Sequence, residues 1–191
     1  MSYEPPRPAR GLLLTPEDRE APARTHRLRR LGLGERAEPA LDAFADRLAR
    51  LTGAPYAMVN FIDEERQFFA GLRIPTIGPV VKADGSRPQV GRCMPRDHGF
   101  CPHVVVRRKA LVLEDVCDYP RFAGNPVVDE YGIRSYLGAP LIDSTAMVLG
   151  TVCVADVEPR PWGRTGLDTI KSTAADLAVR LERGEDTGIP W

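Results

Sequence analysis

Residues 135–156, SYLGAPLIDSTAMVLGTVCVAD, hold two runs of β-forming residues on either side of a short polar connection, Asp143 to Ala146. Two such runs joined by only a few residues are typical of an antiparallel strand pair. The pattern predicts one strand over residues 135–142 and a second over residues 147–156. This pair supplies the first two strands of a sheet.

The second of these strands is apolar on both faces. Strict alternation along the strand puts Leu149 and Cys153 on one face and Val148, Val152 and Val154 on the other. A strand with two apolar faces is covered on both sides. We therefore expect this strand to lie in the centre of a sheet.

A second hairpin is predicted nearer the N-terminus. Residues 56–63 are rich in β-formers, residues 63–66 form a polar turn, and residues 67–73 resume as a strand. A further short strand is expected over residues 110–114. The long segment 74–95 contains four Pro and three Gly and is predicted to be a loop.

Helices are predicted at both ends of this β-rich region. Pro39 suits a first helical turn and Gly53 a C-terminal stop, with one apolar stripe between them. Thr165 and Asp168 resemble a capping box for a helix that Gly184 ends. Between the hairpins, short helices are expected over residues 101–109 and from Asn125, as a cap, to Gly132.

The composition is that of an ordinary globular chain of 191 residues, with 43% hydrophobic residues and 27% charged residues. The 26 basic side chains equal the 26 acidic ones in number, and this balance argues against a nucleic-acid binder or a polybasic membrane anchor. No apolar run approaches the ~20 residues of a membrane span. We expect a cytoplasmic protein with cysteines in the thiol form.

Three segments are expected along the chain. Residues 1–36 form a Pro/Arg-rich extension whose first ten residues are mobile, residues 37–183 form the domain, and residues 184–191 form a tail. Within the extension, Thr15 resembles a helix cap, and Pro22 is expected to interrupt that helix early.

Four side chains with metal-binding or nucleophilic chemistry lie close together in the sequence: Cys93, His98, Cys101 and His103. Their spacing matches no standard zinc pattern, so we assign no metal site. A reactive thiol at Cys93 or Cys101 stays open as an alternative, while Cys117 and Cys153 are expected to be buried.

Several ordered motifs resemble those of GAF domains. They are YAMVNFID at residues 56–63 followed by RQFF at 66–69, FCPH at 100–103, DYPRFAGNP at 118–126, GIRSYLGAPL at 132–141 and LGTVCVAD at 149–156. The resemblance implies an α/β (α+β) fold with a central antiparallel sheet of about six strands. It places the terminal helices on one face of the sheet and a ligand pocket on the other.

The resemblance also implies a function in signal transduction. Family members bind cyclic nucleotides, tetrapyrroles, haem, amino or keto acids, or nothing. This chain lacks the N-K-x-D-E signature of cyclic-nucleotide binders, Pro102 stands where bilin-binding members have His, and the Cys motifs of free methionine sulfoxide reductases do not match Cys93 or Cys117. The resemblance therefore names no cofactor.

The sequence predicts a stand-alone sensory or regulatory domain that binds a small ligand or a signalling partner without catalysis. The candidate ligand-binding residues are Phe68, Cys101, His103, Asp118, Arg121, Phe122, Tyr136 and Asp156. Arg121 is expected to hold an anionic group, and the aromatic residues are expected to form apolar walls.

Two alternatives accompany this prediction. One is a thiol-based redox sensor or reductase that uses Cys93 or Cys101. The other is a protein-interaction module with an empty pocket. The resemblance also implies a homodimer through the terminal helices, and the apolar stripes on residues 41–51 and 167–181 agree either with packing onto the sheet or with pairing between chains.

Overall fold

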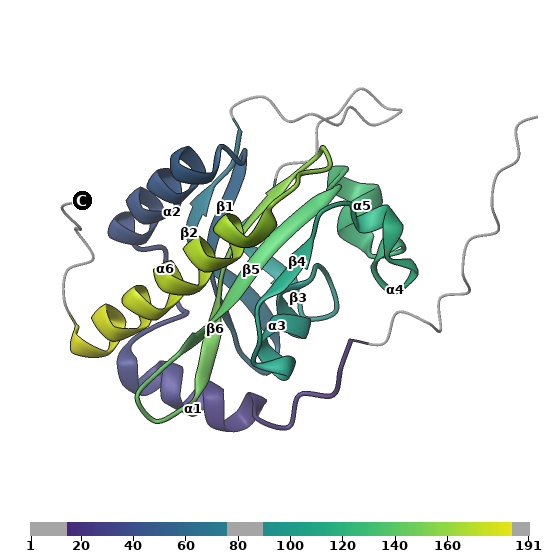
Figure 1. The fold of residues 1–191 in the computed structure, drawn as a ribbon. Coiled ribbons are helices and arrows are strands. Elements are labelled where there is room, and N and C mark those ends of the chain that lie inside the picture. Colours follow the sequence, from purple (N-terminus) through teal and green to yellow (C-terminus); the bar gives the residue numbers. More distant parts are fainter. Residues whose placement is uncertain (1–14, 76–89, 185–191) are drawn as a thin grey trace, which may run out of the picture.

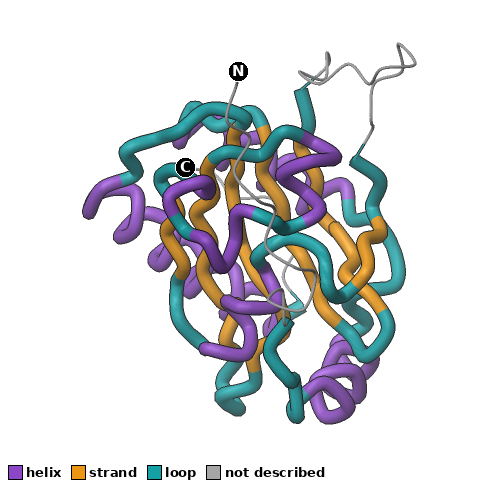
Figure 2. The backbone as a smooth tube through the Cα atoms, turned by 90° about the vertical axis from the view of Figure 1, so that its right-hand side faces the viewer, coloured by secondary structure: helices purple, strands orange, loops and turns teal. Residues whose placement is uncertain are grey.

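Six antiparallel strands form one sheet in the computed structural model, which describes residues 15–75 and 90–184. The order across the sheet is β3–β2–β1–β6–β5–β4, and the predicted antiparallel sheet is confirmed. The strands are β1 (Tyr56–Ile62), β2 (Arg66–Arg73), β3 (Cys93–Pro95), β4 (Leu111–Leu113), β5 (Ser135–Ile142) and β6 (Val148–Asp156). They lie side by side in Figure 2.

The expected central strand is β6, which pairs with β1 on one side and β5 on the other. All nine of its residues are buried, which confirms that both faces are covered. The predicted division of its side chains between the faces was wrong. The register with β5 shifts between Leu141 and Ile142, so Leu149 packs on the same face as Val152 and Val154, opposite Val148 and Cys153.

One face of the sheet is covered by the two terminal helices, as predicted. Helix α2 (Pro39–Thr52) packs on β2 and β1, and helix α6 (Gly163–Arg183) packs on β5 and β6 (Figure 1). Gly53 and Gly184 end these helices in the left-handed conformation, as expected. Their apolar stripes complete a core with the alternate side chains of the strands.

The opposite face is covered by short elements between the hairpins. These are α3 (Cys101–Arg107), the 3₁₀ helix η2 (Val116–Asp118), α4 (Pro120–Ala123) and α5 (Pro126–Tyr131). The Asn125 side chain accepts a hydrogen bond from the Val127 backbone, so the predicted cap of α5 is confirmed. A second apolar core lies between these elements and the sheet.

The described part of the predicted extension, residues 15–36, contains helix α1 (Ala21–Leu31), which packs on β6 and β1. Pro22 stands in its first turn, where a missing backbone N–H costs no hydrogen bond. The predicted interruption at Pro22 was therefore wrong, because this proline begins the helix. The helix start expected at Thr15 is absent, since residues 15–18 are not helical.

Two other local predictions need correction. Cys93–Pro95, expected to be loop, forms edge strand β3 and pairs with β2. Helix α6 begins at Gly163 rather than at Thr165, and no side chain caps it. The rest of the predicted long loop, residues 76–89, lies outside the described residues, as do residues 1–14 and 185–191 of the predicted terminal segments. Within the described ranges, no helix is both long and apolar enough to cross a membrane.

Candidate functional site

A cavity of about 60 Å³ lies between the sheet and the short elements of the second face. Its floor comes from β1, β2, β5 and β6 with edge strand β3 at its rim, and its cover comes from α3, α5 and their connections. The lining residues are Tyr56, Met58, Gln67, Phe69, Val90, Met94, Gly99, Phe100, Cys101, Val127, Tyr131, Ile133, Tyr136, Cys153 and Ala155. The lining is mostly apolar, with a few sulfur, hydroxyl and amide groups.

Strand alternation explains why these side chains meet. Tyr56 and Met58 of β1 project toward the cavity, whereas Ala57 and Val59 pack in the helix-covered core. On β5, the Tyr136 ring lies over Gly138, where a Cβ atom would overlap the tyrosine hydroxyl. Glycine at position 138 therefore leaves the room that Tyr136 needs to lie flat beneath the cavity.

Two sulfurs and a hydroxyl group form a buried cluster at one side of the cavity. The Cys101 sulfur lies 3.3 Å from the Tyr136 hydroxyl and 3.6 Å from the Cys153 sulfur. The contact with Cys153, followed by hydrogen bonds such as that of Tyr136, lowers the pKa of Cys101. The same contact, together with burial, raises the pKa of Cys153, and burial raises that of Tyr136. Cys101 is thus the more acidic thiol of the pair.

A buried amide pair joins the floor of the cavity to its cover. The Asn60 amide donates to Gln67 Oε1 at 2.9 Å. Gln67 Nε2 donates in turn to the backbone oxygens of Pro95 at 2.8 Å and His98 at 2.7 Å. Gln67 of β2 therefore ties the end of β3 and the chain that follows it to the sheet.

Two of the eight predicted ligand-binding residues, Cys101 and Tyr136, line this cavity. Two others pack outside it. His103 meets Phe122 edge-on with ring centres 5.0 Å apart, and Phe122 contacts the cavity-lining Phe100 at 5.8 Å. His103 and Phe122 therefore support the wall of the cavity from behind.

The other four predicted residues lie elsewhere. Phe68 is buried in the core on the opposite face of the sheet, because its neighbour Phe69 occupies the cavity side. Asp118 and Arg121 are exposed on η2 and α4. The Arg121 guanidinium lies 5.9 Å from the Phe122 ring centre, so it holds no position inside the cavity.

Asp156 has a local structural role at the end of β6. Its carboxylate pairs with Arg160 and accepts hydrogen bonds from the backbone of Val157 and Glu158. In the same region, the Arg134 side chain forms a two-point ion pair with Asp115, at 2.6 and 3.0 Å. These pairs hold the turns around the ends of β4, β5 and β6.

The four sulfur and imidazole side chains near residue 100 do not converge. Cys93 is exposed on β3, His98 contacts Asp97 at 2.7 Å, and Cys101 and His103 are buried. Within residues 15–75 and 90–184, no group of three or more His, Cys, Asp or Glu side chains is arranged to hold a metal ion. Cys117, expected to be buried, is exposed, whereas Cys153 is buried as expected.

Sequence reasoning missed most of the cavity lining. Phe69 and Gln67 could have been found, because they share the period-two face that Tyr56 and Met58 define once β1 and β2 are paired. Met94 carried no signal, because its strand is three residues long. Val127 and Ile133 come from a helix and a loop, so only the folded chain brings them to the cavity.

The stability of the protein at acid pH tests whether His103 is buried behind the wall of the cavity. Burial, with Arg121 and Arg107 nearby, lowers the pKa of His103 to about 4. A histidine with a lowered pKa stabilises the fold above its unfolded pKa of about 6.5, and this contribution is lost as the pH falls toward 4. Between these two values, we expect the wild type to lose about 2 kcal/mol of unfolding free energy more than a His103→Leu variant. Urea unfolding at several pH values measures the unfolding free energy of the wild type and of the variant. The same dependence of this free energy on pH in the two proteins would contradict the prediction.

Comparisons with known proteins agree with this architecture. The GAF domain model matches residues 36–181. A cyclic di-GMP phosphodiesterase of Pseudomonas aeruginosa is 34% identical over 132 residues, which are 67% of this chain and 20% of that protein. The chain thus spans one fifth of the length of this curated relative.

Solved structures share the fold at low sequence identity. The GAF domain of an Acinetobacter phosphoenolpyruvate-protein phosphotransferase has a TM-score of 0.57 at 15% identity, over 88% of this chain and 96% of that chain. A free methionine-R-sulfoxide reductase of Neisseria meningitidis has a TM-score of 0.56 at 16% identity, over 87% and 93%. The PixJ GAF domain of Thermosynechococcus elongatus has a TM-score of 0.56 at 16% identity, over 75% and 83%. With the family model matching residues 36–181 and these structures sharing its fold, the chain belongs to the GAF domain family, a sensory and regulatory fold.

Proposed function

We propose that this chain is a cytoplasmic regulatory module that takes a small molecule into the cavity above Tyr136 and passes the change to a signalling partner, without catalysing a reaction itself. The observation that carries the proposal is the cavity, which lies between the sheet on one side and α3, α5 and their connections on the other. All four cysteines are free thiols, which suits a reducing compartment.

The size of the cavity determines how such a ligand would act. Ligand pockets for drug-sized molecules enclose roughly 300–1,000 Å³, several times the 60 Å³ found here. A nucleotide or a tetrapyrrole would fit only if the cover moved away from the sheet. Ligand binding would then favour a more open state, and the ligand must bind that state more tightly than the closed one to shift the balance.

Two hydrogen bonds from the sheet would break in such a movement, those that Gln67 of β2 donates to the backbone oxygens of Pro95 and His98. The two hydrogen bonds of 2.8 Å between Asn125 and the backbone of Gly99 lie within the cover and would help it to move as one unit. The movement would also expose part of the apolar core between the cover and the sheet, so the ligand must replace these contacts with its own.

The similarity to part of a cyclic di-GMP phosphodiesterase supports a place in signal transduction. The corresponding test is native mass spectrometry of the protein purified from its own host, followed by thermal shift against nucleotides, bile pigments and small carboxylic acids. A retained or stabilising small molecule supports the proposal. No binding from any class would leave the interaction-module alternative.

A cavity-filling variant tests the location of the ligand. Ala155 lines the cavity and is buried, so Ala155→Leu places three additional carbon atoms inside it. For a ligand that stabilises the wild type by about 2.7 kcal/mol at 100 times its Kd, we expect the variant to lose most of this stabilisation. Thermal shift with and without the ligand measures the effect.

The control is Ala175→Leu, the same substitution at an exposed position of α6. It should keep the full response to the ligand. An unchanged response in a folded Ala155→Leu variant would place the ligand outside the cavity.

We also propose a homodimer through the helix-covered face. Leu51 at the end of α2 is 65% exposed, beside a groove of about 390 Å³ lined by Phe44, Arg47, Leu48, Arg50, Leu51 and Thr173. Nε and Nη2 of Arg47 are buried there and have no hydrogen-bond partner among the described residues. A second copy would cover Leu51 and could supply the missing acceptors.

Leu51→Asp tests the dimer, because a charge in an apolar interface is left without its water. We expect the variant to be monomeric at micromolar concentration where the wild type is dimeric, as measured by light scattering. Ile142→Asp, at another exposed apolar position, should leave the dimer intact. A monomeric wild type would remove the claim.

A further inference from the structure

The two buried cysteines are placed together although they lie 52 residues apart in the sequence. Cys101 is the first residue of α3, and Cys153 lies in the middle of β6. Their sulfurs are 3.6 Å apart, and both residues line the cavity. The other two thiols, Cys93 and Cys117, are exposed. The fold therefore contains one close dithiol, and it faces an internal space.

We propose that Cys101 and Cys153 are a modification site: hydrogen peroxide, small enough to enter the cavity, oxidises the two thiols to an intramolecular disulfide. This inference does not rest on the ligand proposed above. In reducing compartments, disulfides that do form are mostly transient and redox-sensing, which is the behaviour this pair would show.

The geometry requires only a local movement. A disulfide bond is about 2.05 Å long, so the sulfurs must approach by roughly 1.5 Å. Cys153 cannot move far, because β6 is bonded to a neighbouring strand on each side, with Met58 and Gly138 as its register partners. Cys101 begins a short helix, so we expect α3 and its connection to Phe100 to move toward the sheet.

The cavity decides which oxidants can react. A water molecule needs about 10–15 Å³, so the 60 Å³ of the closed state admits a molecule of two heavy atoms but is too small for bulky organic peroxides. The lining beside the sulfurs is apolar, with Phe100, Ala155 and Ile133 among its residues. A small uncharged oxidant is therefore the class that this space would accept.

The reaction balances with hydrogen peroxide as the oxidant. The Cys101 thiolate attacks one peroxide oxygen, the O–O bond breaks, and the departing oxygen takes up a proton and leaves as water, so that Cys101 becomes a sulfenic acid. The Cys153 sulfur then attacks the Cys101 sulfur, the S–O bond breaks, and the hydroxyl group leaves as a second water with the Cys153 proton. Two thiols are oxidised, and one peroxide is reduced to two waters.

The surroundings favour Cys101 as the attacking thiol. The Tyr136 hydroxyl lies 3.3 Å from its sulfur and can donate to a thiolate. The pKa of Cys101 is lowered and that of Cys153 is raised, and the thiolate is the nucleophilic form. Closing the disulfide would withdraw the Cys101 sulfur from Tyr136 and reshape the cavity wall.

The test uses the full chain with Cys93→Ser and Cys117→Ser, which removes the two exposed thiols and leaves the buried pair. The folded protein is treated with hydrogen peroxide, denatured with an alkylating reagent and analysed by peptide mass mapping. We expect both thiols to disappear together, a linked peptide pair containing Cys101 and Cys153, and full reversal by dithiothreitol. Two alkylated cysteines after treatment, or over-oxidation of one cysteine without a linked pair, would overturn the proposal.

Two comparisons sharpen the result. With Cys153→Ala added, the remaining Cys101 should be trapped by dimedone as a sulfenic acid, and trapping without the partner supports its role as the attacking thiol. Circular dichroism checks that this variant folds, and if it does not, the two-thiol protein alone decides. Hydrogen peroxide should oxidise the pair at least about ten times faster than cumene hydroperoxide does. Equal rates would contradict the proposal that the oxidant reaches the two sulfurs through the cavity.

Discussion

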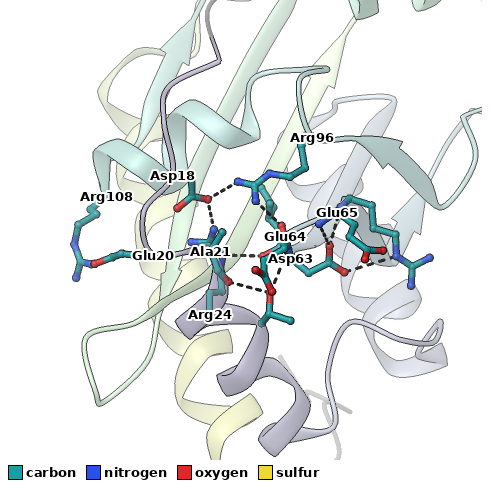
Figure 3. A network of polar contacts seen from close by, with 12 residues as sticks. Asp18, Glu20, Ala21, Arg24, Asp63, Glu64, Glu65, Arg96 and Arg108 are labelled. Atoms are coloured by element: carbon teal, nitrogen blue, oxygen red, sulfur yellow. Dashed lines mark hydrogen bonds and ion pairs between the residues drawn. The ribbon is translucent and has the colours of Figure 1, made fainter.

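The Arg24→Met variant is expected to lose about 3–5 kcal/mol of unfolding free energy, because it breaks a buried ion pair from one side. Arg24 is fully buried in α1. Its Nε donates to the Ile62 backbone oxygen at 2.7 Å, and its guanidinium pairs with Asp18, whose side chain is only 7% exposed (Figure 3). Methionine retains most of the volume but leaves the Asp18 carboxylate and the Ile62 carbonyl with fewer partners.

The same network ties three parts of the chain together. Asp18 also pairs with Arg96, and Arg96 donates to the Asp63 backbone oxygen at 2.7 Å (Figure 3). The segment before α1, the β1–β2 turn and the connection after β3 therefore share one buried set of charges. Burial lowers the pKa of Arg24, and the Asp18 carboxylate opposes this effect.

Urea denaturation measures the loss. The control is Arg19→Met, because Arg19 pairs with Glu17 while both side chains are largely exposed, and such pairs contribute about 0–1 kcal/mol. An Asp18→Asn, Arg24→Met double variant should lose less than the sum of the two single variants, since each single variant already loses the Arg24–Asp18 pair; Arg96 loses its Asp18 partner in both variants that carry Asp18→Asn. A loss in Arg24→Met no larger than in Arg19→Met would contradict the argument.

The Gly150→Ala variant is expected to lose about 3 kcal/mol, the upper end of the usual cost of overpacking a core. Gly150 lies in β6 between Phe61 of β1 and Leu141 of β5. A Cβ atom there would overlap the Asn60 backbone oxygen and lie 2.9 Å from the Phe61 Cα. Because the obstacle is the backbone of the neighbouring strand, no side-chain rotation can relieve it.

The matched control is Gly91→Ala, where a Cβ atom would have no heavy atom within 4 Å. We expect a change of about 0.5 kcal/mol or less for this variant. Thermal or urea unfolding of both proteins provides the comparison. Equal stability of the two variants would show that β1 and β6 can separate at this point without cost.

The local elements of this fold were predictable because their signals are local. The runs of β-forming residues at 56–63 and 135–142, the stop at Gly53 and the cap at Asn125 all depend on neighbours within a few residues. Two errors arose where a long-range contact decides. Cys93–Pro95 becomes a strand because β2 offers an open edge, and the faces of β6 change because its register with β5 shifts.

The candidate site was only partly predictable for the same reason. Cys101 and Tyr136 were identified from motifs and line the cavity. Asp118 and Arg121 were chosen for their polarity, but both lie on the surface of the protein. Choosing Phe69 over Phe68 required knowing which face of β2 the cavity occupies. The Cys101–Cys153 contact joins a helix to a strand 52 residues later, and no periodicity within either element reports it.

By itself, the amino-acid sequence determined the hairpins, the amphipathic terminal helices and membership of the GAF domain family. Hydrophobic periodicity, helix capping and ordered motifs each depend on residues that lie close together in the chain. Only the tertiary structure decided which side chains enclose the cavity, how large that cavity is, and which two thiols meet beside it. The physical reason is that these properties depend on strand register and on the packing of short covering elements, which are set by contacts between residues distant in the chain.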